Sequence, residues 1–490
     1  MTAGQEQEKK VPIEQIGSND VDYQHARIHD IDEAAERKVL RKIDLIVLPM
    51  MCLVFFTQYL DKQSLSYASV YGLLTDLNLT SHQYSWLTSC FYLAQLASEW
   101  PFIYLMSRFP IAKFVGITII LWGGVCMCLA VPNNFAGFAA VRCLLGFTEG
   151  AVSPAFITIT SIWYKKEEHP LRVGMWVTCN GIAQIVGSLM MYGIGENLSH
   201  LSIAPWRLMF LLCGAVTIFA GVLFFIAMPT GPDSAWFLSP DERIVAARRL
   251  ASQHDGGDKT SFSWKQFSEA CFDIKTFHVF MFGILVTMCS PVLTFASLVI
   301  KNLGYTSSQT LLYGSPSGAI QIGFIWVGIA GCLWFPNRRN MVVLLLCIVP
   351  LVGCILLTVL PLDAGWGMIV ASWLASVISS QFSLLMSLSA SNVRGNTKKA
   401  FVNAVFFVGY STGCIAAPQL WTAPPRYRAG VICALVDWGL VCVFIPSYWY
   451  LCWRDNKKRD QMQCQEGGVQ EFVDGADMTD KEDKSFRYTT

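Results

Sequence analysis

The feature that most constrains this chain is a series of twelve apolar stretches, each about 20 residues long and bounded by charged or turn residues. A helix needs about 20 apolar residues to cross the hydrocarbon core of a bilayer, so each stretch predicts one transmembrane helix. We expect these helices at residues 43–65, 85–106, 114–131, 135–163, 174–194, 208–228, 277–300, 312–335, 341–360, 366–390, 401–421 and 431–453. The sequence therefore predicts an all-α membrane protein.

The composition agrees, because 53% of the 490 residues are hydrophobic and only 14% are charged. Soluble domains carry about 25% charged residues, so much of this chain must face lipid. The 36 basic and 35 acidic residues nearly balance, which argues against nucleic acid as a partner. Fifteen of the 17 cysteines lie in apolar stretches, and we interpret them as packing residues rather than as a disulfide framework.

A polar stretch divides the spans into two six-helix halves. We expect an N-terminal tail (residues 1–42), a first half (43–228), a linker (229–276), a second half (277–453) and a C-terminal tail (454–490). Both tails are polar, and we expect disorder over Met1–Arg37 and Asp455–Thr490. Within the linker, Ser239-Pro240-Asp241-Glu242 predicts a capped helix that runs to about Ala251.

A second linker helix is expected further along the chain. Trp264, Phe267, Cys271 and Ile274 recur at helical spacing and predict a helix that lies on the membrane surface with these residues on one face. Plain connecting helix is the alternative for both linker segments, and we favour it over a regulatory role.

The distribution of Lys and Arg sets the orientation. With a cytoplasmic N-terminus and twelve crossings, 30 of the 36 basic residues fall on the cytoplasmic side. The two Asn-x-Ser/Thr sequons, at Asn78 and Asn197, both fall in outside loops and are candidate glycosylation sites. Both termini are therefore predicted to be cytoplasmic.

Charged residues inside spans hold most of the functional information, because each costs at least about 2.5 kcal/mol at the centre of a bilayer. The second half contains one of them, Asp437, which we interpret as structural. The first half contains five: Asp61, Lys62, Glu99, Arg142 and Glu149. No Walker-type phosphate loop or nucleophile elbow occurs, and no histidine lies in a span core. We therefore expect neither an enzyme nor a bound metal or cofactor.

Arg142 and Glu149 share a helix face two turns apart, which is about 10 Å and too far for direct pairing. Glu149 falls near the bilayer midplane between Gly146 and Gly150, small residues that admit a neighbouring backbone. A partly desolvated carboxylate there is a candidate proton carrier, and a fixed ion-pair partner is the alternative.

The roles of three further residues, Glu99, Asp61 and Lys62, are left open between a functional and a structural interpretation. Glu99 is either a second relay carboxylate or a polar group paired within its helix. Asp61 and Lys62 are either functional or an interfacial pair whose side chains reach the outer headgroups.

Several fragments between about Lys42 and Trp453 form a specific set, and the stretch around Glu149 is its most specific part. The fragments are LDKQSLSYA (60–68), YSWLTSCFYLAQLASEWP (84–101), RFPIAK (108–113), RCLLGFTEGAVSPA (142–155), WYKKEEHPLR (163–172), LSPDER (238–243), NVRGNTKKA (392–400) and GYSTGCIAAPQLW (409–421). In these fragments the chain resembles the fungal allantoate permease family, within the anion:cation symporters of the major facilitator superfamily.

The resemblance implies uptake of a small organic anion, such as a vitamin or a ureide, with protons across the fungal plasma membrane. It maps the family's anion-binding basic residue onto Lys62, with Ser64 in place of the family's Asn, and its fourth-helix glutamate onto Glu149. It also maps the preceding arginine onto Arg142, whereas Arg394 and Asn396 depart from the family's usual residues. Proton-driven efflux of a metabolite and a non-transporting nutrient sensor are the alternatives.

The expected mechanism is alternating access by a monomer. The anion meets Lys62 and Arg142 while Glu149 is protonated, and rocking of the halves then releases both anion and proton inside. The second half is expected to supply neutral contacts to the substrate, from Gln381, Asn403, Tyr410 and Gln419.

Overall fold

Helices form the whole framework of the protein. The structure, a computed structural model, describes residues 33–165, 168–197, 202–251, 262–335, 338–465 and 477–490. No strand occurs within these ranges. The all-α class expected from the sequence is therefore confirmed.

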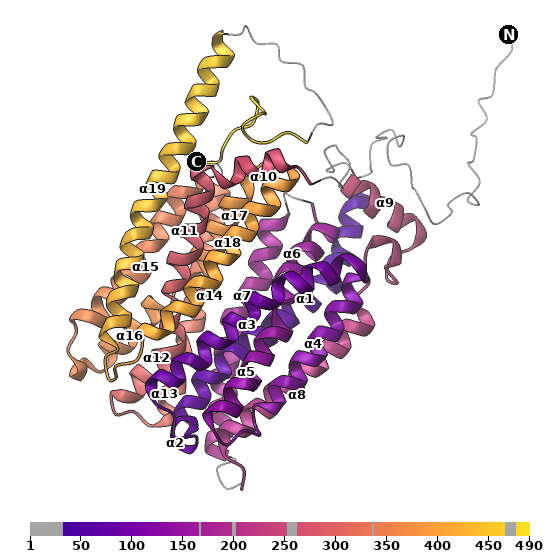
Figure 1. Cartoon of the computed structure of the whole chain (residues 1–490). Helices are drawn as coiled ribbons and strands as arrows, with labels where there is room; N and C mark the ends of the chain where they lie inside the picture. The colour runs from indigo at the N-terminus through magenta and orange to yellow at the C-terminus, as the bar shows by residue number, and fades with distance from the viewer. Residues whose placement is uncertain (1–32, 166–167, 198–201, 252–261, 336–337, 466–476) are drawn as a thin grey trace, which may run out of the picture.

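The first six spans form one side of the molecule in Figure 1. Five of them are single helices, and the fourth is divided in two; a short helix, α2 (Leu73–Asp76), follows the first span. Their bounds are α1 (Glu33–Val70), α3 (Ser81–Arg108), α4 (Ile111–Cys128), α5 (Phe135–Glu149) with α6 (Val152–Trp163), α7 (His169–Asn197) and α8 (Pro205–Ala227).

The last six spans form the other side, with four of them divided into two helical pieces. Their bounds are α11 (Ile274–Met288) with α12 (Pro291–Asn302), α13 (Ser307–Gly314) with α14 (Pro316–Trp334), α15 (Arg339–Val359), α16 (Trp366–Ala375) with α17 (Ser379–Ser391), α18 (Asn396–Ala416) with η5 (Ala417–Leu420), and α19 (Arg428–Gln465). The turn η4 (Leu362–Ala364) precedes α16.

Ten of these twelve spans are long and apolar enough to cross a bilayer. The other two, α1 and α3, have 38 and 28 residues; α1 carries Asp61 and Lys62, and α3 carries Glu99. Both pack among the apolar helices, α1 against α7 and α8, and α3 against α5. The expected fold of twelve transmembrane helices in two six-helix halves is confirmed.

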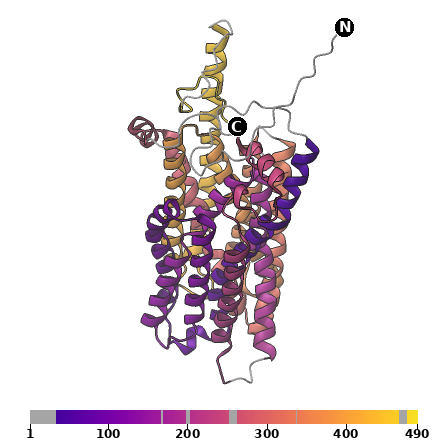
Figure 2. The same ribbon diagram turned by 90° about the vertical axis from the view of Figure 1, so that its right-hand side faces the viewer.

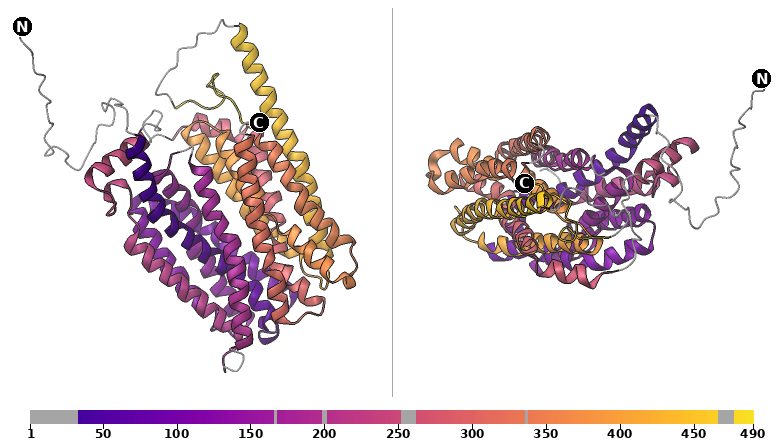
Figure 3. Two further views of the ribbon diagram at one scale, coloured as in Figure 1. Left: turned by 180° about the vertical axis from the view of Figure 1, so that it is seen from behind. Right: turned by 90° about the horizontal axis from the view of Figure 1, so that it is seen from above.

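Each half packs mainly within itself, and the two halves meet along a narrower seam (Figure 3). In the first half α4 lies along α8, and in the second half α11 lies along α18. The seam is formed by α7 with α14, α3 with α18, and α1 with α12. A site between the halves is therefore lined by α1, α3 and α7 on one side and by α12, α14 and α18 on the other.

Both described chain ends and the linker lie at one end of the bundle, which we call the terminal end; the opposite end is the distal end (Figure 1). Hydrogen bonds between the described residues of the two halves lie at the distal end and half way along the bundle. At the distal end Ser307 Oγ donates to the Val70 carbonyl at 2.9 Å, as does the Lys301 ammonium, and Gln419 Nε2 donates to Ser89 Oγ at 2.8 Å. The halves are thus fastened together at the distal end.

The linker helix α9 (Pro240–Ala251) follows the turn η3 (Pro232–Ser234) and has the bounds expected from the sequence. Ser239 and Glu242 form the predicted reciprocal cap, with Glu242 N donating to Ser239 Oγ at 3.3 Å. Lys42 of α1 binds both oxygens of Glu242, at 2.7 and 2.8 Å. The Lys42 hydrogen bond and the backbone of Ser239 together lower the pKa of Glu242 to about 2.

Two expectations at the terminal end are wrong. The tail Asp455–Thr490 is not wholly disordered, because α19 continues to Gln465 beyond the bundle (Figure 2) and residues 477–490 pack on the second half. The helix that was to carry Ile274 ends earlier: α10 (Trp264–Cys271) stops, and Asp273 caps a new helix that begins at Ile274. Residues 1–32 lie outside the described ranges.

Candidate functional site

The centre of the first half contains an ion pair between α1 and α5. Lys62 Nζ lies 3.1 Å from Glu149 Oε1, and Gln58 Nε2 donates to the same oxygen at 2.9 Å. Glu149 is fully buried, whereas the Lys62 side chain keeps 20% of its surface exposed. The second carboxylate oxygen, Oε2 of Glu149, has no hydrogen-bond partner within the described ranges. The carboxylate is therefore only partly satisfied, and its cation is the accessible member of the pair.

Close helix packing holds Glu149 in place. Glu149 is the last residue of α5, and α6 begins only at Val152, so the span is interrupted beside the carboxylate. A Cβ atom at Gly146 would lie 2.1 Å from the Phe91 carbonyl of α3, and one at Gly150 would lie 2.0 Å from the Ser98 hydroxyl. The two glycines therefore let α5 approach α3 closely, as the sequence predicts.

Arg142 lies on the same helix but is not part of the pair. It is buried, and its guanidinium carbon lies 5.9 Å from the Phe138 ring centroid and 5.8 Å from that of Phe210. Two of its nitrogens, Nε and Nη2, have no hydrogen-bond partner among the described residues. Arg142 is thus a buried cation with unused donors and aromatic neighbours.

Asp61 is a buried acid that the sequence left open. One oxygen accepts a hydrogen bond from Thr217 Oγ1 at 3.0 Å and the other accepts from Cys126 Sγ at 3.5 Å. No described cation forms an ion pair with it. The interfacial reading of Asp61 and Lys62 is wrong, because α1 continues to Val70 and places both residues inside the bundle.

Glu99 is not brought into this cluster. It lies half-buried on α3, and no described residue forms a hydrogen bond or an ion pair with it. The adjacent Trp100 keeps 65% of its surface exposed, so this part of α3 lies at the edge of the bundle. Its neighbour on the other side, Ser98, packs against Gly150, which leaves Glu99 close to the cluster in the fold without contacting it.

The residues of the second half that were expected to contact the substrate lie in different places. Tyr410 of α18 packs edge-on to Tyr92 of α3 across the seam, with ring centroids 6.2 Å apart. Gln381 is buried elsewhere and donates to the Leu346 carbonyl at 2.8 Å. Asn403 is half-buried on α18, with no hydrogen-bond partner among the described residues.

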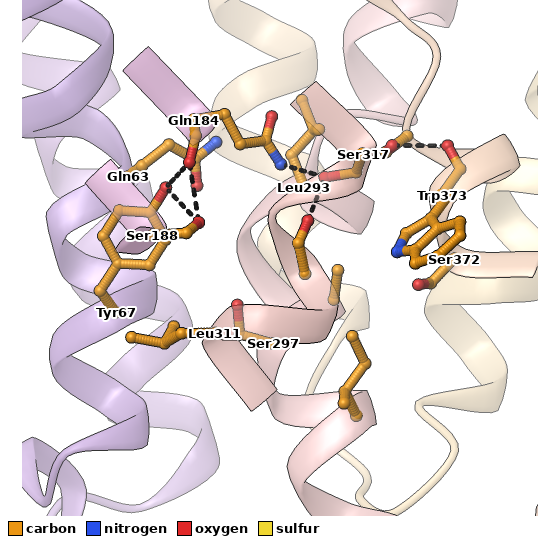
Figure 4. A pocket seen from close by; sticks show the side chains of 14 residues that line it. Gln63, Tyr67, Gln184, Ser188, Leu293, Ser297, Leu311, Ser317, Ser372 and Trp373 are labelled. Atoms are coloured by element: carbon orange, nitrogen blue, oxygen red, sulfur yellow. Dashed lines mark hydrogen bonds between the residues drawn. The ribbon is translucent and has the colours of Figure 1, made fainter. Parts of the chain in front are cut away.

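A small polar cavity lies between the halves. Figure 4 shows Tyr67, Gln184 and Ser188 from the first half facing Ser317 and Ser372 from the second half. The cavity volume is about 20 Å³, which is room for about one water molecule. Gln63 lines the same cavity and follows Lys62 directly in the chain. The cavity in this state is therefore too small for an organic substrate.

Glutamines that the sequence reading missed connect the two halves at this level. Gln184 Nε2 of α7 donates to Ser317 Oγ at 2.6 Å, and Gln321 Nε2 of α14 donates to Gln184 Oε1 at 2.7 Å. Ser379 of α17 donates in turn to Gln321 Oε1 at 3.0 Å. Uncharged amides inside apolar spans were the available signal, because such groups need partners in a membrane.

Two six-helix halves, with charged residues buried within the bundle, are the arrangement typical of secondary membrane transporters. Residues 51–418 match the Major Facilitator Superfamily, and the chain belongs to this family of multi-pass membrane transporters.

Among its relatives, an uncharacterized transporter of Schizosaccharomyces pombe, C417.10, is 36% identical over 96% of this chain and 92% of its own length. The allantoate permease of Saccharomyces cerevisiae is 29% identical over 95% of this chain and 89% of its own length. A solved structure of the xylose transporter XylE from E. coli, in a partially occluded inward-open conformation, covers 83% of this chain and 99% of its own. It matches with a TM-score of 0.61 at 13% identity, which is a likeness of fold alone.

Proposed function

We propose that the protein takes up a small organic anion together with a proton by alternating access. The observation that supports this most is the ion pair between Lys62 and Glu149, in which the buried acid neutralises a cation that stays accessible. The likeness to the allantoate permease supports an anionic substrate of the vitamin or ureide kind.

Charge balance gives the physical basis for coupling. With the site empty, the charges of Lys62 and Glu149 cancel. An anion alone would leave the buried site with one net negative charge, and a proton alone would leave it with one net positive charge. Only the two ions together restore neutrality, and an uncompensated charge in a low-dielectric interior is costly. Anion and proton therefore favour each other's binding.

Other groups complete the proposed site. Arg142, with its unused donors, is a second cation for the anion, and Asp61 balances its charge within the same bundle. Tyr410 and the cavity lined by Gln63 and Gln184 would contact the uncharged part of the substrate once the site opens.

The proposed orientation places the terminal end in the cytoplasm and the distal end outside, with the plasma membrane as the location. The charge bias of the sequence supports it, and both Asn78 and Asn197 are exposed at the distal end. The structure would then correspond to a state that is closed to the outside.

Uptake into a transport-deficient host tests the proposal. Radiolabelled vitamins, ureides and amino-acid derivatives are offered at pH 5 and at pH 7.5 to cells that express the wild type or Lys62→Gln. We expect at least one carboxylate to accumulate, faster at pH 5, and no accumulation with the variant. Faster export of a preloaded compound, or equal uptake by the variant, would contradict the proposal.

A further inference from the structure

Residues 477–490 form a segment of turns and irregular backbone on the terminal end of the second half, between α10 and the protruding part of α19 (Figure 1). Four residues of the segment are buried: Thr479, Asp480, Asp483 and Tyr488. The basic residues Lys481 and Lys484 are exposed. The face that the segment turns to the protein is thus polar and acidic, which a merely adhering tail would not require.

The buried acids of the segment meet cations that come from the start of α18. Lys398 Nζ lies 2.7 Å from Asp480 Oδ1, and its side chain is only 2% exposed. The same ammonium lies 2.8 Å from Glu269 of α10 and 3.0 Å from Asp273, the residue that caps α11. Arg394 forms an ion pair with Asp483.

Two asparagines bind the backbone of the segment. Asn392 accepts from the N–H of residue 489 at 2.7 Å and donates to its carbonyl at 3.0 Å. Asn456 of α19 binds the N–H and the carbonyl of Tyr488 in the same way, both at 2.9 Å. Bonds to main-chain groups of an extended strand are how proteins bind peptides, with side-chain contacts adding specificity.

The Tyr488 side chain is held as well. Its hydroxyl donates to Asp480 Oδ2 at 2.6 Å. Two cations contact its ring: the Lys275 ammonium lies 3.3 Å from the ring centroid and the Arg459 guanidinium carbon lies 4.6 Å from it. Five side chains therefore form a peptide-binding surface, which we call the clasp site: Asn392, Arg394, Lys398, Asn456 and Arg459.

The segment also holds α10 in place. Gln266 Nε2 donates to the Asp477 carbonyl at 2.8 Å, while its Oε1 accepts from Thr397 N at 3.0 Å. The Thr479 hydroxyl donates to Glu269 Oε2 at 3.0 Å. α10 is therefore joined both to the segment and to the first turn of α18.

We propose that the clasp site is a peptide-binding site that holds residues 477–490 as a releasable clasp, and that docking keeps α10 fixed to the second half. Release leaves Lys398 facing the two carboxylates Glu269 and Asp273. Docking adds the carboxylate of Asp480 and the ammonium of Lys481, which lies 3.1 Å from Asp273. The net charge of this cluster is thus the same in both states. Release also separates Arg394 from Asp483, but the Arg394 side chain is already 41% exposed and can be solvated.

The chain connection favours the docked state, because a short tether gives an effective concentration on the order of millimolar. A negative charge at Thr479 opposes docking, because the buried hydroxyl faces the carboxylate of Glu269. The inference does not depend on which substrate is transported.

Hydrogen exchange of the purified full-length protein, read by mass spectrometry, tests the clasp. In the wild type we expect protection of the amides of Tyr488 and Thr489. In Asn392→Ala/Asn456→Ala we expect exchange in residues 477–490 to rise at least about tenfold, since the four hydrogen bonds that the two asparagines make to the segment are lost. Exchange in α10 should rise with it, while that in α8 stays unchanged.

Thr479→Glu should release the segment without altering the clasp site, and Thr479→Ser, which keeps the hydroxyl, is its matched control. This pair also serves if the asparagine variants fail to fold. Unprotected amides at residues 488 and 489 in the wild type would overturn the docking. A released segment that leaves exchange in α10 unchanged would overturn the link to the linker.

Discussion

Replacing Glu149 by Gln removes one charge while keeping a side chain of almost the same shape. With 3.1 Å between Lys62 Nζ and Glu149 Oε1, and an effective dielectric constant of about 20, the lost attraction is about 5 kcal/mol. The amide imitates the protonated acid, so Lys62 is free for an anion at any pH. Measured couplings between sites are smaller, about 1–3 kcal/mol, which predicts a 5- to 150-fold effect of the proton on anion affinity in the wild type.

The assay is uptake into proteoliposomes with an acidic exterior. The wild type should accumulate the anion above its equilibrium level, whereas Glu149→Gln should only equilibrate it and should still exchange labelled for unlabelled anion. Its anion affinity should not change between pH 5 and pH 7.5. Glu99→Gln is the matched control, because that acid has no contact with Lys62 in the described structure. Uphill accumulation by Glu149→Gln would refute the charge-balance reasoning.

Three further predictions concern packing, pH and orientation. Gly146→Ala should destabilise the fold by about 1–3 kcal/mol in thermal unfolding, since the added methyl meets a backbone carbonyl of α3; Gly124→Ala, with open space around it, should have little effect. The pKa of Glu242 is lowered to about 2, so its stabilising contribution is present above its usual pKa of 4.5 and is lost as the pH falls toward 2. The melting temperatures of wild type and Glu242→Gln should therefore differ by a constant amount from pH 5 to 8 and approach each other as the pH falls from about 4.5 toward 2. If the distal end is extracellular, glycosidase should shift the wild type on gels but not Asn78→Gln/Asn197→Gln, and a shift of the double variant would count against these sites.

The spans could be predicted because each one depends only on the residues of its own segment. A run of about 20 apolar residues must cross the bilayer whatever its neighbours do, and the caps of linker helix α9 are likewise set within four residues. The burial of Glu149 could also be predicted, from a carboxylate between two glycines in an apolar stretch.

The partners of these residues could not be predicted in the same way. The sequence left Asp61 and Lys62 open between a functional role and an interfacial pair, because both lie near the expected end of the first span at Leu65, yet α1 runs on to Val70. From sequence alone, polar residues near the end of a span are expected to be exposed. They are buried only where another helix packs over them. That cover comes from α4, α5 and α8, which are distant in the chain.

The sequence by itself thus determined how many times the chain crosses the membrane and which charged residues lie within the spans. The reason is that the free energy of placing a residue in lipid depends mainly on that residue's own side chain. Only the tertiary structure decided that Lys62 pairs with Glu149, that Gln184 and Gln321 join the halves, and that residues 477–490 dock on the second half. Each of these contacts joins groups far apart in the chain. Their geometry follows from the packing of whole helices, which no local pattern encodes.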